Sequence, residues 1–228
     1  MHPQRRDIFL YLVLPAVVGA ALLAMFFSGV GWLQSLVVPV VNREYGLLEN
    51  LQNLLLLALI VVGWRAARRT QRGLDRAGWR ALAVFALFVL LEEIDFGLHY
   101  YESLAGVPGA ERATLRNFHN QEGVLRWMKL GVDSTLALFF VALPWAGRRI
   151  QHPTVRWSMP SRWLTATLSL SLLVSRVAHY GTDHGWPTNG TIESNVSEFR
   201  ELFTYYIFLL YLFDLGLRRP PRPGKDPR

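Results

Sequence analysis

Apolar residues are concentrated in six long blocks, and short polar connections separate these blocks from one another. Each block has roughly 17 to 22 residues, which is the length that crosses a lipid bilayer as an α-helix. The blocks cover residues 8–28, 47–64, 81–101, 127–145, 162–179 and 199–217. This pattern predicts an all-α, polytopic membrane bundle of about six transmembrane helices.

The composition agrees with a membrane protein. Of the 228 residues, 51% are hydrophobic and only 18% are charged, whereas about a quarter of the residues in a soluble domain are charged. The chain has no cysteine, which excludes disulfides, thiolate catalysis and cysteine-bound metals. We expect residues 1–217 to form a single transmembrane domain. Residues 218–228 are rich in Pro and charge, and they are expected to be a disordered basic tail.

The basic residues indicate how the chain is oriented. The net charge is +7, and 17 of the 24 Lys and Arg residues lie in four polar segments. Those segments are 1–7, 65–80, 146–162 and 217–228. Because cytoplasmic loops of membrane proteins are enriched in Lys and Arg, both termini are predicted to be cytoplasmic, with the protein in a bacterial inner membrane. The basic loops are expected to contact the anionic headgroups of the lipid bilayer, and no nucleic-acid partner is expected.

The acidic residues are concentrated on the opposite side of the predicted bundle. One apolar block ends with LEEIDFGLH, which contains Glu92, Glu93, Asp95 and His99. In a continuous helix, Glu92, Asp95 and His99 share one stripe. A carboxylate in the bilayer core costs at least about 2.5 kcal/mol and normally faces the bundle interior with a partner. A shared proton, an Arg side chain or a metal ion is therefore expected beside this stripe.

Polar groups on the same side of the other predicted helices indicate a common cavity, open to the periplasm. Arg176, His179 and Asp183 fall on one helical stripe, and Glu198 and Glu201 share another. Besides the four residues above, the predicted lining consists of Glu49, Asn117, His119, Asn120, Arg176, His179, Asp183, Glu198 and Glu201.

Three segments of the chain resemble a family of bacterial multi-pass membrane proteins with no established activity. They are LEEIDFG (91–97) and NFHNQEG (117–123), preceded by REYGLLENLQ (43–52). The pattern of that family runs Glu-Glu-Ile-x-x-Gly and then Asn-x-His-Asn. The resemblance implies a shared site at Glu49, Glu92, Glu93, Gly97, Asn117, His119 and Asn120. This chain has Asp95 and His99 where the family has Ser and Arg, which makes the implied site more acidic and more like a metal site.

The predicted site has the residue types of a metal centre. Histidine and carboxylate side chains on facing helices are how helical bundles bind Zn, Fe or Mn. The predicted ligands are Glu92, His99, His119 and His179, with Glu93 or Asp95 as general base. Such a site predicts a metal-dependent hydrolase or transferase acting on a lipid or lipid-linked substrate. Two alternatives stay open: a small proton- or cation-coupled transporter, in which buried acids relay charge, and a non-catalytic assembly or partner protein.

Overall fold

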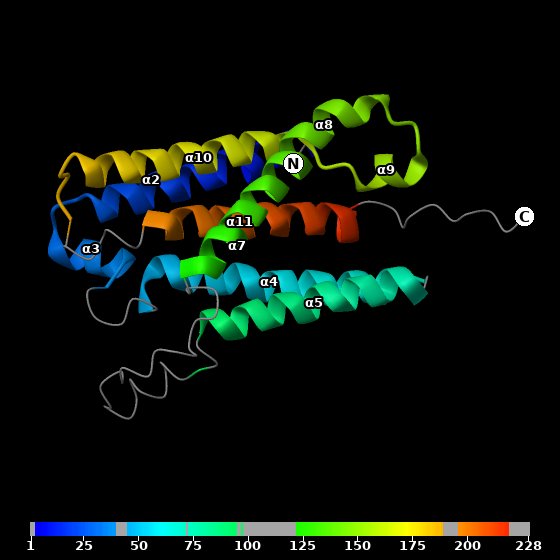
Figure 1. Cartoon of the computed structure of the whole chain (residues 1–228), viewed down its shortest axis with the longest axis horizontal. Coiled ribbons are helices and arrows are strands. Elements are labelled where there is room, and N and C mark those ends of the chain that lie inside the picture. The colour runs from blue at the N-terminus through cyan, green and yellow to red at the C-terminus, as the bar shows by residue number, and fades with distance from the viewer. Residues whose placement is uncertain are drawn as a thin grey trace, which may run out of the picture.

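The computed structural model of the chain describes residues 3–39, 45–71, 73–94, 97, 122–188 and 196–218. Every regular element in these ranges is a helix, and the longest helices lie side by side as a bundle (Figure 1). The predicted all-α fold is therefore confirmed for the part of the chain that the structure describes.

The helices follow the chain in a simple order. The first run is α1 (Pro3–Ile8), η1 (Phe9–Val13) and α2 (Leu14–Phe26), followed by the short α3 (Gly31–Val37). Next come α4 (Leu47–Arg69) and α5 (Gly73–Glu93). A further run is α7 (Glu122–Ala137), η5 (Leu138–Ala142), α8 (Leu143–Ala146) and η6 (Gly147–Arg149), with the short α9 (Pro153–Ser158) after it. The last two are α10 (Arg162–Asp183) and α11 (Val196–Phe213), which continues as η7 (Asp214–Arg218).

Two helical stretches in the described ranges are long and apolar enough to cross a membrane. They are Arg5–Phe26, which combines α1, η1 and α2, and Leu47–Arg69, which is α4. Each of the other predicted blocks also overlaps a helix. The prediction of about six spans goes beyond these two stretches and stays a prediction.

Helices α4 and α5 form a close-packed hairpin. Helix α4 ends at Arg69 and α5 begins at Gly73, so the polar connection predicted at 65–80 is largely helical. Arg and Ala are strong helix formers, and the drop in hydropathy after residue 64 therefore does not end the helix. A Cβ added at Gly63 would lie 3.1 Å from the Cβ of Ala83 and 3.3 Å from the carbonyl oxygen of Trp79. The missing side chain of Gly63 thus lets the two backbones approach.

Helix α11 is the central helix of the bundle. It packs against α4 on one side and α10 on the other, while α2 lies beside α10 (Figure 1). Near its start, Phe199 and Phe203 are buried with Phe26 of α2. Toward its end, Tyr211 is buried with Phe140 of η5. Side chains of α11 therefore contribute to the core at both ends of the molecule.

Helix α5 ends earlier than the sequence predicts. The apolar block was expected to continue to residue 101, but the α-helix ends at Glu93. Gly97 has a φ of 83°, in the left-handed region that glycine adopts without strain, and its N–H donates to the Ile94 carbonyl 2.7 Å away. A left-handed residue cannot continue a right-handed helix. Helix α5 therefore ends before Asp95 and His99, which lie outside the described residues, and the predicted stripe through Glu92, Asp95 and His99 stays a prediction.

Candidate functional site

Three helices bring carboxyl groups to one end of the bundle. Glu49 is near the start of α4 and Glu93 is the last residue of α5, so each lies some twenty residues from the hairpin turn. At a rise of about 1.5 Å per residue, both are about 30 Å of helix away from that turn. Glu198 joins them from the first turn of α11, which packs against α4.

Glu49 and Glu198 form the closest pair in this carboxyl cluster. Their carboxyl groups lie within hydrogen-bonding reach of each other, and Glu93 and Glu201 are near enough to act on Glu49 electrostatically. The Nε2 atom of Gln52 donates to Oε2 of Glu198 at 3.0 Å and to its carbonyl oxygen at 3.1 Å. Gln52 is fully buried. The amide of Gln52 thus holds the start of α11 against α4.

Glu93 is held by a second contact with α11. The hydroxyl of Tyr205 donates to Oε1 of Glu93 at 2.7 Å. Tyr205 follows Glu198 by seven residues, or two helical turns, so both side chains lie on the same face of α11. In the first turn of α11, that face therefore lies close to Glu49 of α4. One to two turns further along α11, it contacts Glu93 of α5.

Two amide oxygens beside the carboxyl cluster have no hydrogen-bond donor among the described residues. They are Oε1 of Gln52 and Oδ1 of Asn53, and both atoms are buried. A buried polar atom without a partner costs about 1 to 3 kcal/mol. The Gln52 oxygen belongs to the same amide that contacts Glu198, so this cost is located at the carboxyl cluster.

The carboxyl cluster gathers groups that are negatively charged when they are ionised. Glu49, Glu93 and Glu198 come close together in a partly buried region, and like charges at short range disfavour full ionisation. Two carboxyl groups within hydrogen-bonding reach of each other need a proton or a cation between them. The chemistry that the arrangement supports is therefore reversible binding of a proton or a small cation.

The remaining predicted site residues fall into two groups. Glu92 is half-buried beside Glu93 in the last turn of α5 and makes an interaction of its own. Glu201 is also half-buried and has a further interaction. The residues that lie outside the described part of the chain are Asp95, His99, Asn117, His119 and Asn120.

The predicted stripe on α10 is present, but it faces outward. Arg176, His179 and Asp183 are all exposed. The buried face of α10 instead contains Val174 and Ala178, which pack with residues of α2 and α11. The structure therefore does not bring the α10 stripe into a buried cavity with Glu49 and Glu198.

The predicted metal centre is only partly within the described residues. Of its four predicted ligands, Glu92 and His179 are described, and they lie on α5 and α10. Within the described ranges, no group of three or more His, Asp or Glu side chains is arranged to hold a metal ion. The metal site with Zn, Fe or Mn thus stays a prediction.

A second ionic cluster at the other end of α11 was missed by sequence reasoning. Tyr11 donates through its hydroxyl to Oδ2 of Asp214. Arg218 donates to Oδ1 of Asp214 at 2.6 Å and to Oδ1 of Asp7 at 2.8 Å. Tyr11 and Asp214 lie in the π-helical turns η1 and η7. A signal was present, because Asp7 and Tyr11, like Asp214 and Arg218, are four residues apart and share a helix face.

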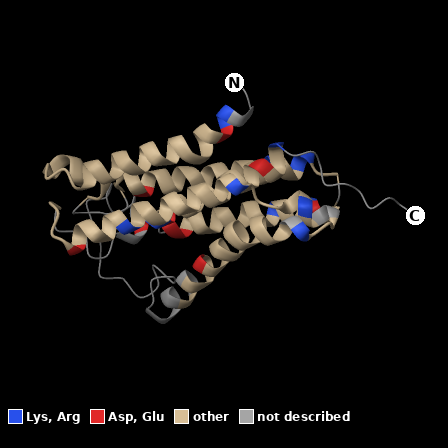
Figure 2. Cartoon of the chain, turned by 90° about the horizontal axis from the view of Figure 1, so that it is seen from above, with Lys and Arg blue, Asp and Glu red and all other residues tan. Residues whose placement is uncertain are grey.

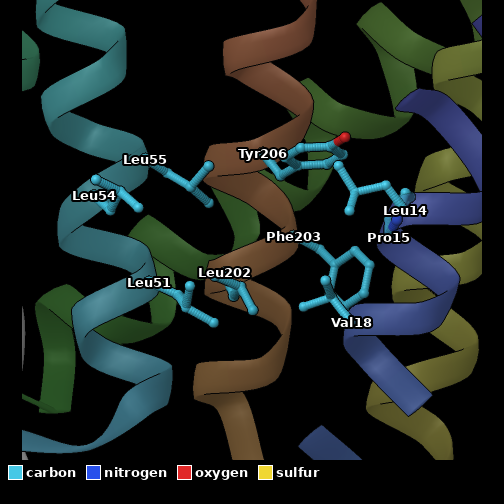
Figure 3. Close-up of a pocket in the computed structure, with 9 residues that line it drawn as sticks. All are labelled: Leu14, Pro15, Val18, Leu51, Leu54, Leu55, Leu202, Phe203 and Tyr206. Atoms are coloured by element: carbon cyan, nitrogen blue, oxygen red, sulfur yellow. The ribbon is translucent and has the colours of Figure 1, made fainter. Parts of the chain in front are cut away.

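An apolar pocket of about 190 Å³ lies between α2, α4 and α11. Figure 3 shows the side chains that line it, which are Leu14, Pro15, Val18, Leu51, Leu54, Leu55, Leu202, Phe203 and Tyr206. Tyr206, the polar side chain among these nine, donates its hydroxyl to the Leu10 carbonyl at 2.5 Å. Phe203 and Tyr206 lie on a different face of α11 from Glu198 and Tyr205. The pocket and the carboxyl cluster are therefore separate features of the bundle.

Comparisons of the chain with protein-family models, curated proteins and solved structures find no match. The resemblance to bacterial multi-pass membrane proteins therefore stays a prediction that depends on the sequence motifs. The function of the carboxyl cluster must be inferred from its own residues.

Proposed function

We propose that this protein is a multi-pass inner-membrane protein of about six spans that acts as a small proton- or cation-coupled transporter. Glu49, Glu93 and Glu198 would be its proton-binding groups. The observation that carries this proposal is the meeting of three carboxyl groups from three helices, with Glu49 and Glu198 within hydrogen-bonding reach of each other. Buried acids of this kind relay charge in membrane pumps and transporters.

Surface apolarity supports the membrane part of the proposal. Val17, Leu54, Phe85 and Leu138 lie on four different helical runs, and each is at least 60% exposed. Such a broad apolar surface is rare on soluble monomers. In a bilayer these side chains contact lipid, and the two membrane-length helices supply part of that surface.

The distribution of charge supports the orientation. Lys and Arg are concentrated at the end of the bundle near the C-terminus (Figure 2). Arg68 and Arg69 at the end of α4, Arg76 in α5 and Arg218 in η7 belong to this basic end. With the basic end in the cytoplasm, the carboxyl cluster lies on the periplasmic side.

A metal-dependent hydrolase or transferase acting on a lipid or lipid-linked substrate is the second candidate. It is favoured by the two consecutive carboxyl residues at the end of α5, Glu92 and Glu93, because carboxylates are ligands for divalent metals. Elemental analysis of the purified protein distinguishes the two candidates. Stoichiometric Zn, Fe or Mn, together with loss of the metal in Glu92→Gln, would favour the enzyme over the transporter.

Proton movement across vesicles tests the proposed function directly. The protein is reconstituted into lipid vesicles that contain a pH-sensitive dye, and an outward gradient of alkali-metal chlorides is imposed, with and without a membrane potential. We expect faster acidification than in protein-free vesicles, and we expect Glu49→Gln to abolish the difference. Asp75→Asn is the matched control, because Asp75 lies in the first turn of α5, at the opposite end of the α4–α5 hairpin from Glu93. Equal proton movement in wild type and Glu49→Gln would contradict the proposal.

A further inference from the structure

The two unpartnered amide oxygens indicate what else the carboxyl cluster binds. Oε1 of Gln52 and Oδ1 of Asn53 are buried on α4, within one turn of Glu49. Each needs a positively polarised partner, which the described protein atoms do not supply. With Glu49 and Glu198 they make a set of four side chains that offer oxygen atoms only, and such a set suits hard cations of the alkali and alkaline-earth type.

Charge decides which hard cation this set suits. If Glu49 and Glu198 share one proton, the pair carries a single negative charge. Replacing that proton by one monovalent cation leaves the total charge unchanged, with both carboxylates ionised and one cation between them. A divalent ion would change the charge of a partly buried site by one further unit. Within the described ranges, moreover, no three acidic or His side chains are arranged around a metal.

We infer that Glu49, Glu198, Gln52 and Asn53 form a binding site for a monovalent alkali cation, with Na⁺ the expected ion, which exchanges one-for-one with a proton. The step is balanced: Na⁺ enters, the O–H bond of the shared carboxyl proton breaks, and one H⁺ leaves. This inference rests on the proposed function, and it names the coupling ion of the same site.

Other ionisable groups surround Glu49 and Glu198, and their charges affect how Na⁺ binding at this pair depends on pH. Glu93 faces Glu49 from α5, and Glu201 faces it from α11. Tyr205 faces Glu93 and is neutral at ordinary pH. The carboxyl groups of Glu93 and Glu201 attract both Na⁺ and H⁺ when ionised, so the competition between the two ions stays in place.

Radioactive sodium binding to the full-length protein in detergent tests the inference. We expect saturable binding that unlabelled NaCl displaces and choline chloride does not. Because one proton competes with one Na⁺, the apparent Kd should rise by about tenfold per unit fall in pH once the proton dominates. In weakly buffered solution, one proton should be released for each Na⁺ bound. Saturable Mg²⁺ displacement at lower concentration than Na⁺ would overturn the assignment to a monovalent ion.

Two variants and a matched control connect the binding to the amide oxygens. Asn53→Ala removes one oxygen and should weaken Na⁺ binding by about tenfold or more, the loss expected from one ion-contacting group. Gln52→Leu removes one oxygen together with the hydrogen bonds to Glu198, so its loss should be at least as large. Gln34→Leu makes the same change at a buried amide of α3, which donates to the Pro187 carbonyl at 2.9 Å, and it should bind Na⁺ as wild type does. If Gln52→Leu does not fold, Asn53→Ala alone decides the point.

The outcomes separate this inference from the proposed function. No saturable Na⁺ binding at neutral or mildly acidic pH, with proton movement intact, would overturn the Na⁺ site and leave a purely proton-coupled protein. Equal loss of binding in Gln34→Leu and Asn53→Ala would also overturn it. Intact Na⁺ binding without proton movement across vesicles would count against the proposed function alone.

Discussion

Helix α11 carries ionisable side chains at both ends, and the two groups have different kinds of hydrogen-bond and charge partners. At the basic end, Asp214 accepts from Tyr11 and from Arg218, and Arg218 also reaches Asp7. Every acid in that cluster has a cationic or hydroxyl donor from the protein. At the other end, the carboxyl group of Glu49 lies within hydrogen-bonding reach of another carboxyl group, that of Glu198.

The contacts of a buried acid, rather than its residue type, therefore decide its role. The Asp214 cluster supplies its own counter-charge, so its role is to fasten the first helical run to the last. Among the described residues, Glu49 and Glu198 face each other without a cationic side chain between them, which is why the proposed function gives this pair a proton or a cation. Natural proteins accept such local unfavourable arrangements mainly where function requires them.

The largest change in the free energy of unfolding is expected at the Asp214 cluster. Asp214→Asn removes the charge that pairs with Arg218 while keeping the size of the side chain, and breaking a buried ion pair costs about 3 kcal/mol or more. We expect the free energy of unfolding, measured by denaturant titration in detergent micelles, to fall by that amount. Asp133→Asn, at an ion pair whose acid is 47% exposed, should change it by less than about 1 kcal/mol. Similar losses in both variants would remove the proposed distinction between buried and exposed pairs.

A smaller loss is expected where an uncharged donor contacts the carboxyl cluster. Tyr205→Phe removes the hydroxyl that donates to Glu93, and a hydrogen bond to a charged group contributes about 2 kcal/mol. Tyr206→Phe is the matched control, because its hydroxyl donates to an uncharged carbonyl and should cost about 1 kcal/mol. The same denaturant titration measures both variants. An equal or larger loss in Tyr206→Phe would show that Glu93 does not depend on Tyr205.

The smallest expected change in the free energy of unfolding is an increase. Glu49→Gln replaces a carboxyl that faces Glu198 by an amide that can donate to it, so unfolding should require about 1 kcal/mol more free energy. Proton movement across vesicles should be lost in the same variant. A gain in stability with a loss of activity is the signature of a strained functional site. If Glu49→Gln destabilises the protein as Asp214→Asn does, the contrast between the two ends fails.

Much of the fold follows from patterns within single segments. The helices and the gathering of Glu49, Glu93 and Glu198 on one side are predicted from the apolar blocks and the distribution of charge. Periodicity also groups Arg176, His179 and Asp183 correctly on one face of α10. Periodicity does not predict whether that face points into the bundle or outward. The face of α10 that packs into the core instead contains small residues such as Ala178.

The parts that the sequence does not predict depend on long-range contacts. The Tyr11–Asp214 hydrogen bond joins residues 203 positions apart. The four-residue spacings of Asp7 with Tyr11 and of Asp214 with Arg218 are visible in the sequence, but they do not predict that the two pairs meet. Tyr205 lies within an apolar block, where an aromatic residue reads as core, so its contact with Glu93 is visible only in the structure. The end of α5 was missed because apolar residues continue past Glu93, although the helix does not.

In the α4–α5 hairpin, Glu49 and Glu93 lie the same number of residues from the turn. The position of Glu93 in the carboxyl cluster therefore depends on the length of α5. One residue inserted in α5 between Gly73 and Glu93 would rotate Glu93 by about 100° and shift it by about 1.5 Å, taking it away from Tyr205. The same insertion in the connection between Arg69 and Gly73 would leave both helical registers unchanged. Tolerance to insertions in this hairpin should therefore depend on where a residue is added, with the turn permissive and either arm restrictive.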